Sequence, residues 1–183
     1  MQDRWQLRRR QALDMPSLPN RVVLDYAQEC QAHAFGFARV IGMKGRADHK
    51  GRWNKDLSLH EFIGENAEAV GAEIATAQFF GLRDFTPTLN TFKDEADVGG
   101  RLEVKWTKYI NGSLIINKTD RDDDVAVLVV GRSPVYSLAG WIPIKMARVE
   151  RFYHRMQDNY WITQRDLFPI TDLRSSSYGT SID

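Results

Sequence analysis

The sequence predicts one α/β (α+β) domain in which a mixed β-sheet is flanked by helices. Three observations support this prediction: an amphipathic helical pattern over 59–82, several short strand-like segments between 86 and 142, and a run at 125–130 that is apolar at every position. A continuously apolar run is typical of a central strand covered on both faces, because a half-exposed strand alternates apolar and polar residues. We therefore expect helices to pack against the sheet.

Length and composition fit a single globular domain. The chain has 183 residues and a formal net charge of +1, and a domain of this size buries roughly 70% of its unfolded surface. We expect an N-terminal arm over 1–20, one domain over 21–173 and a disordered tail over 174–183. One cysteine and four histidines offer no zinc-site spacing. No apolar run approaches the roughly 18 residues that span a bilayer, so a cytoplasmic protein without membrane contact is expected.

The first helix is predicted over 22–41, with Asn20 as its N-cap. A stripe at three-to-four spacing is expected to pack against the core. It consists of Val23, Ala27, Cys30, Ala34, Phe37 and Ile41.

The second helix is predicted over 59–82, with a Ser58 and Glu61 capping box at its start and Gly81 at its end. Its apolar stripe consists of Leu59, Phe62, Ile63, Val70, Ile74, Ala77 and Phe80. Glu73 falls inside this stripe. A buried carboxylate costs several kcal/mol unless it is paired or binds metal, so Glu73 is a candidate site residue. The alternative is a Glu at the stripe edge whose stem bends to solvent.

Strands are predicted over 86–92, 96–98, 102–107, 113–117, 125–130 and 135–142, with consecutive strands joined as antiparallel hairpins. In the strand at 102–107, Glu103 and Lys105 share one side because side chains alternate. The other side carries Leu102, Val104 and Trp106.

The turn before this strand decides whether Asp97 joins the pair. A two-residue loop at Gly99 and Gly100 would place Asp97 opposite Leu102, on the wrong face. A three-residue loop ending at Arg101 would place it opposite Glu103. We favour the second register, or a bulged equivalent. Two carboxylates beside a lysine can bind a hard divalent cation, whereas the alternative is an ordinary solvated strand face.

Two basic segments are weaker candidates for nucleic-acid contact. The first consists of Lys44, Arg46, Lys50, Arg52, Trp53 and Lys55, and its alternative is a solvated loop. The second consists of Arg148, Arg151 and Arg155, which we expect on one face of a helix. That face could bind a phosphate backbone, contact the acidic loop at 120–124 or face water. The four acids of that loop lack the spacing of a calcium loop, so we expect them to face solvent.

Asp97 and the Glu103-Val104-Lys105 strand resemble the core of the PD-(D/E)xK nuclease superfamily, with Ala96 in place of the proline of its name. The helical segment around Glu73 resembles the helix that precedes the catalytic strands in small phage-encoded nucleases of this superfamily. The stretch 159–169 is similar to the tail of those proteins.

This resemblance implies a restriction-endonuclease-like core and Mg²⁺- or Mn²⁺-dependent hydrolysis of DNA phosphodiester bonds. Asp97, Glu103 and the backbone carbonyl of Val104 would hold the metal, with Glu73 directly or through water. Lys105 would orient or deprotonate the attacking water. A phage-encoded protein would act in the host cytoplasm, and nucleases of this kind that cut duplex DNA often act as dimers, so a homodimer is also considered.

Two other classes of function stay open. The first is a non-catalytic DNA-binding or assembly protein on the same fold, because a fold alone does not fix a function. Glu103 and Lys105 argue against this class, because a DNA-binding surface would gain nothing from an acidic pocket that faces phosphates. The second is a metalloenzyme of another class, against which stands the scarcity of histidine and cysteine.

Overall fold

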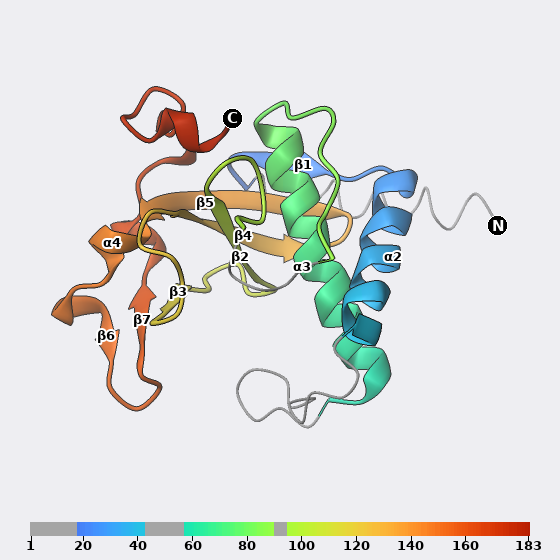
Figure 1. Cartoon of the computed structure of the whole chain (residues 1–183), viewed down its shortest axis with the longest axis horizontal. Coiled ribbons are helices and arrows are strands. Elements are labelled where there is room, and N and C mark those ends of the chain that lie inside the picture. The colour runs from blue at the N-terminus through green and yellow to red at the C-terminus, as the bar shows by residue number, and fades with distance from the viewer. Residues whose placement is uncertain (1–17, 43–56, 90–94) are drawn as a thin grey trace.

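The computed structural model describes residues 18–42, 57–89 and 95–183 (Figure 1). The helices are α2 (Tyr26–Gly42), α3 (Leu59–Phe79) and α4 (Ile144–Ala147). The strands are β1 (Arg21–Val23), β2 (Leu102–Thr107), β3 (Leu114–Asn117), β4 (Val125–Arg132), β5 (Val135–Pro143), β6 (Tyr153–His154) and β7 (Asn159–Ile162). Short 3-10 helices are η1 (Glu150–Phe152), η2 (Gln164–Asp166), η3 (Ile170–Asp172) and η4 (Gly179–Ser181).

In the described part of the chain the main sheet has four strands, in the order β1-β5-β4-β2. Strand β2 runs parallel to β4, and the other neighbours are antiparallel. The predicted mixed sheet with helices is therefore confirmed. Strand β4 is buried at every position from Val125 to Val130, which confirms the prediction of a central strand covered on both faces.

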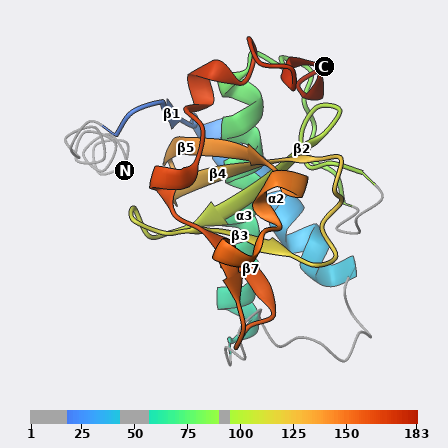
Figure 2. The same cartoon turned by 90° about the vertical axis from the view of Figure 1, so that its left-hand side faces the viewer.

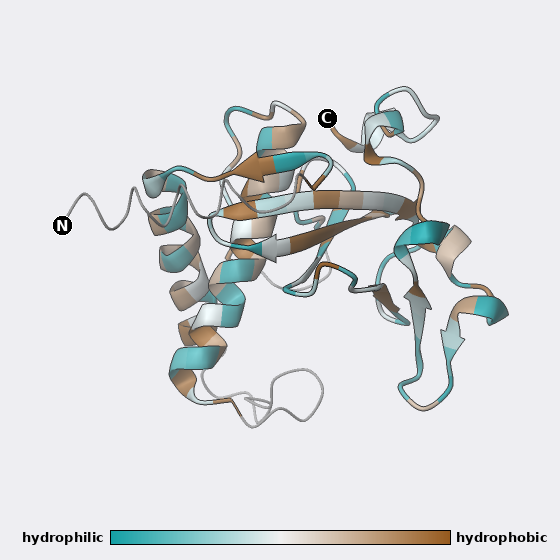
Figure 3. Cartoon of the chain, turned by 180° about the vertical axis from the view of Figure 1, so that it is seen from behind, coloured by the Kyte–Doolittle hydropathy of each residue, from teal (hydrophilic) through white to brown (hydrophobic). Residues whose placement is uncertain are grey.

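Each face of the main sheet packs against a different layer (Figure 2). Helix α3 covers one face, where the apolar cluster includes Val70, Ile74 and Val127. A small antiparallel sheet, β3-β7-β6, and α4 lie over the other face, around Leu114, Leu128 and Ile162. The hydropathy colouring shows apolar stretches along β4 and β5, between these layers (Figure 3). Strand β2 is at one edge of the main sheet, beside both layers.

The prediction that consecutive strands form hairpins is confirmed for β4 and β5 but wrong for β2, β3 and β4. The chain leaves β2, passes through β3 in the small sheet and returns to place β4 parallel to β2. A parallel pair needs such a crossover connection, which local turn signals do not reveal. Residues 86–89 of the predicted strand at 86–92 are not a strand, and the rest of it lies outside the described residues.

The capping box and the end of α3 match the prediction. Ser58 accepts a hydrogen bond from the Glu61 backbone N–H, and Glu61 accepts one from Ser58 in return. Gly81 has a φ of 72°, which glycine adopts without strain. The predicted apolar stripe is buried from Val70 onward, whereas Leu59 is 61% exposed at the helix start.

The prediction for α2 is wrong in its start and in its buried face. Residues 21–23 form β1, and α2 begins at Tyr26. The buried residues of α2 are Ala32, Gly36, Arg39 and Val40, and a Cβ added at Gly36 would overlap the backbone of Ala67 in α3. The helix therefore turns this face toward α3 and the expected stripe outward, so Phe37 is 51% exposed.

Residues 174–183, for which we expected disorder, fold against the turn before β2. They include η4, and Ile182 is 1% exposed. The backbone N–H of Arg101 donates to the carbonyl of Ser181 at 3.0 Å. No helix within the described ranges combines the length and apolarity that crossing a membrane requires.

Candidate functional site

The turn before β2 has the register that we favoured from the sequence. Val98 and Leu102 exchange two backbone hydrogen bonds, of 3.0 and 3.1 Å, across the three residues between them. The three-residue loop therefore places Asp97 opposite Glu103. Gly99 has a φ of 57° and packs against the backbone of Ile182, so a glycine is required at this turn.

Glu103 and Lys105 point to the face of β2 that the small sheet covers. Leu102 and Val104 pack in the cluster under α3, so the alternating side chains between them point the other way. The Lys105 ammonium is 2.7 Å from Glu103 Oε1 and 3.0 Å from Asp120 Oδ2. The Asp120 side chain is 1% exposed. The prediction that the four acids of this loop face solvent is wrong for Asp120 and Asp124, which are buried. The loop after β3 turns Asp120 inward onto Lys105, and Asp124 pairs with Arg121.

Glu73 is buried on the α3 side of β2, as its position in the helical stripe predicted. Arg39 of α2 holds both of its carboxylate oxygens, at 2.7 and 2.8 Å. Arg39 also donates its Nε–H to the carbonyl of Thr88 at 2.9 Å. Burial raises the pKa of Glu73, and the Arg39 guanidinium opposes this shift. The explanation for this buried carboxylate is therefore an ion pair.

Asp97 lies between these two groups, at the outer edge of β2. Its Oδ2 accepts a hydrogen bond of 2.8 Å from the Val104 backbone N–H. Within a strand the N–H and C=O of one residue point to the same side. The Val104 carbonyl therefore faces the same edge as the Asp97 carboxylate, as the proposed metal ligation requires.

Carboxylates are grouped around the edge of β2. Among the described residues, Glu73, Asp97, Glu103 and Asp120 lie here with the cations Arg39 and Lys105, and Asp124, which is paired with Arg121, interacts with Glu103 and Arg101. Burial, with the neighbouring charges of Glu73 and Glu103, raises the pKa of Asp97 well above its usual range. A proton or a cation taken up beside Asp97 would relieve the repulsion among these carboxylates.

Oxygen donors of this kind suit a hard divalent cation such as Mg²⁺, and not zinc. In the residues that the structure describes, no three His, Cys, Asp or Glu side chains are grouped closely enough to hold a metal ion by themselves. The ion pair with Arg39 occupies Glu73 on the far side of β2, which leaves Asp97, Glu103 and the Val104 carbonyl as the donors at the strand edge.

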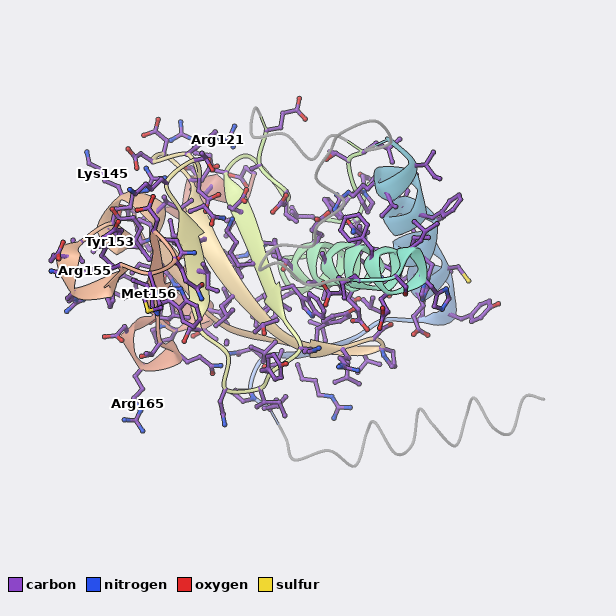
Figure 4. The ribbon with its side chains drawn as sticks, turned by 90° about the horizontal axis from the view of Figure 1, so that it is seen from below. Arg121, Lys145, Tyr153, Arg155, Met156 and Arg165 are labelled. Atoms are coloured by element: carbon purple, nitrogen blue, oxygen red, sulfur yellow. The ribbon has the colours of Figure 1, made fainter. Side chains whose placement is uncertain are left out.

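The basic residues proposed for nucleic-acid contact are not gathered at this site. Those of the first segment, 44–55, lie outside the described residues. Arg148, Arg151 and Arg155 share no helix, because η1 and β6 interrupt the segment. Arg148 binds the acidic loop: its guanidinium pairs with Asp122 and donates to carbonyls of the segment 117–120. Arg155 is on the small sheet, across the main sheet from α3 (Figure 4).

Two residues of the site were not found from the sequence. The acid at Asp120 was considered and assigned to solvent, because the four acids of its loop have no motif that separates one from the others. Arg39 gave no signal at all, since an arginine in the last turn of a helix is ordinary. Only the packing of α2 on α3 brings it to Glu73.

Comparison of the chain with protein-family models, with curated proteins and with solved structures finds no match. The likeness to the nuclease superfamily therefore depends on the residues described above.

Proposed function

We propose that this protein is a Mg²⁺- or Mn²⁺-dependent nuclease that hydrolyses phosphodiester bonds in DNA, on a restriction-endonuclease-like core. The observation that carries the proposal is the grouping of carboxylates at the edge of β2, with Asp97 opposite Glu103 and Lys105 one step along. Phosphodiester hydrolysis needs a cation to offset phosphate charge, and this edge offers it oxygen ligands.

Asp97, Glu103 and the Val104 carbonyl would hold the ion. Mg²⁺ commonly takes one or two carboxylates and completes its shell with water and substrate phosphate, so these few donors are sufficient. Bound there, the ion would polarise the scissile phosphate and acidify an attacking water. Glu73 would influence the ion only through water or through its charge, because Arg39 holds both of its carboxylate oxygens.

Lys105 is the residue that would touch the reacting atoms. An ammonium has three N–H donors; Glu103 accepts one of them, and Asp120 forms an ion pair with the ammonium at 3.0 Å. A remaining N–H can donate to the attacking water or to a phosphate oxygen. In this way Lys105 orients the nucleophile and offsets negative charge that develops on the phosphate.

The test is cleavage of linear, circular and single-stranded DNA by the purified protein in Mg²⁺, in Mn²⁺ and in EDTA. We expect cleavage with either metal and none in EDTA. Lys105→Ala should lower the rate by about 10²–10³-fold, the usual cost of removing a donor that stabilises developing negative charge. Asp97→Asn should also lose activity because it removes a ligand charge.

Matched controls separate the site from general loss of charge. Lys145 and Asp123 are exposed residues, and Lys145 projects from α4 (Figure 4). Lys145→Ala and Asp123→Asn should cleave DNA as the wild type does. If the wild type binds DNA but leaves every substrate intact in both metals, the nuclease proposal fails and a DNA-binding or assembly role takes its place.

A further inference from the structure

We infer that Asp120 is a positioning residue for Lys105, and that the loop 117–124 is built to hold it there. This inference rests on the proposed function for its catalytic consequence. The underlying contact, of 3.0 Å between Asp120 Oδ2 and the Lys105 ammonium, can be tested without DNA.

The Asp120 carboxylate is fixed by its own loop. The same Oδ2 that meets Lys105 accepts a hydrogen bond of 2.8 Å from the Asn117 backbone N–H. The Asp120 N–H in turn donates to the Asn117 carbonyl at 3.1 Å. The carboxylate is therefore oriented before it meets the lysine, as a preorganised acceptor.

The loop that carries Asp120 is anchored from outside. Arg148 donates to the carbonyls of Asn117, Lys118 and Asp120, and pairs with Asp122. At the far end, Arg121 pairs with Asp124 at 2.7 Å, and the Asp124 carbonyl accepts from Ile144 N–H at 3.0 Å. Charge-assisted bonds of this kind are stronger than neutral ones, so the loop behaves as a rigid support.

The consequence concerns the position of the Lys105 ammonium. Glu103 lies on the same strand, accepts one hydrogen bond from the ammonium at 2.7 Å and has a side chain that is 23% exposed. Asp120 comes from another element and is almost fully buried, and its carboxylate attracts the ammonium at 3.0 Å. Lys105 is therefore held between two carboxylates, and the N–H groups that Glu103 does not occupy are left for a reacting group.

The experiment measures the reactivity of the Lys105 amine toward trace acetic anhydride, with Lys145 as the internal reference, by mass spectrometry of the digested protein. Asp120→Asn removes the charge but keeps the shape. We expect its Lys105 labelling, relative to Lys145, to rise about tenfold, because the ammonium loses the charge of an ion-pair partner that is almost fully buried. Asp123→Asn is the matched control and should label as the wild type does. Labelling of Lys105 that is unchanged in a folded Asp120→Asn protein would overturn the inference.

A second variant keeps the test decisive if Asp120→Asn does not fold. Arg148→Lys loosens the loop without touching the site, because lysine cannot reproduce the planar, multiply bonded guanidinium. Its Lys105 labelling should rise by a smaller factor than in Asp120→Asn. Unchanged labelling in folded Arg148→Lys would then overturn the inference.

Cleavage kinetics provide the catalytic part of the test. A role in orientation predicts that Asp120→Asn lowers kcat for DNA cleavage while KM changes little, because the group acts on the reacting atoms and not on substrate binding. A loss of kcat/KM that comes entirely from a higher KM would count against the positioning role. If the wild type cuts no DNA, the proposed function fails, and the labelling result still decides whether Asp120 holds Lys105.

Discussion

Strand β2 separates two ion-pair groups that differ in their balance of charge. On the α3 side, Arg39 and Glu73 pair one to one through two hydrogen bonds, with side chains 7% and 5% exposed. On the other side, Lys105 contacts two carboxylates, those of Glu103 and Asp120. The first group is a one-to-one pair, whereas in the second one cation contacts two carboxylates from different elements. We therefore expect the first group to contribute mainly to stability and propose cation binding for the second.

The largest effect on stability is expected from breaking the ion pair between Arg39 and Glu73. Arg39→Met leaves the Glu73 carboxylate buried without its partner, which should cost about 3–5 kcal/mol of stability. Chemical denaturation of the apo protein measures this loss. A double variant that also replaces Glu73 with Met should recover most of it, because an apolar pair needs no compensating charge. The control is Arg155→Met, whose partner Glu150 is 3.5 Å away on the surface. If Arg39→Met is as stable as this control, the pair has no structural role.

A smaller loss of stability should follow from a substitution that pushes α3 away from the main sheet. Gly71 lies against the Tyr136 hydroxyl, and a Cβ added there would overlap it. The Tyr136 hydroxyl is fixed by a hydrogen bond of 2.8 Å to Glu68. Gly71→Ala should therefore cost about 1–3 kcal/mol.

Gly64 is the matched control for this change, because it lies in the same helix and a Cβ there meets nothing within 4 Å. Gly64→Ala should stabilise the protein by about 0.5–1 kcal/mol, the usual gain over glycine within a helix. Thermal unfolding of the two variants compares them directly. Equal shifts of the same sign would show that the approach of α3 to β5 is not tight.

A divalent metal ion that binds the carboxylates at the edge of β2 should stabilise the protein. A divalent cation that binds only the folded state stabilises it, by about 2.7 kcal/mol when present at 100 times its dissociation constant. We expect Mg²⁺ to raise the unfolding midpoint of the wild type relative to EDTA. Asp97→Asn should lose this shift, whereas Asp123→Asn should keep it. A shift of equal size in the Asp97 variant would place the ion elsewhere.

The smallest effect concerns pH. Burial beside Glu73 and Glu103 raises the pKa of Asp97 in the folded protein, so the folded state keeps its proton to a higher pH than the unfolded chain does. The stability of the apo protein should then fall as pH rises through the folded pKa of Asp97. Asp97→Asn removes this contribution, so its free energy of unfolding should decrease less as pH rises. Urea denaturation in EDTA at a series of pH values measures this dependence. An Asp97 variant with the wild-type pH dependence would contradict the raised pKa.

The local features of this protein could be predicted from its sequence. The capping box of α3, the burial of Glu73, the central strand β4 and the three-residue turn before β2 were all predicted, because each depends on the spacing of neighbouring residues. The alternation of β2 was enough to place Glu103 and Lys105 on one side.

The partners that these residues meet became visible only in the folded protein. The parallel pairing of β2 with β4, the buried face of α2, and the contacts of Glu73 with Arg39 and of Lys105 with Asp120 all join distant segments. Such contacts depend on how closely elements approach one another, as the small residues of α2 against α3 show. Periodicity within one segment carries no information about that distance, so the sequence placed the acids and the lysine without revealing what balances their charge.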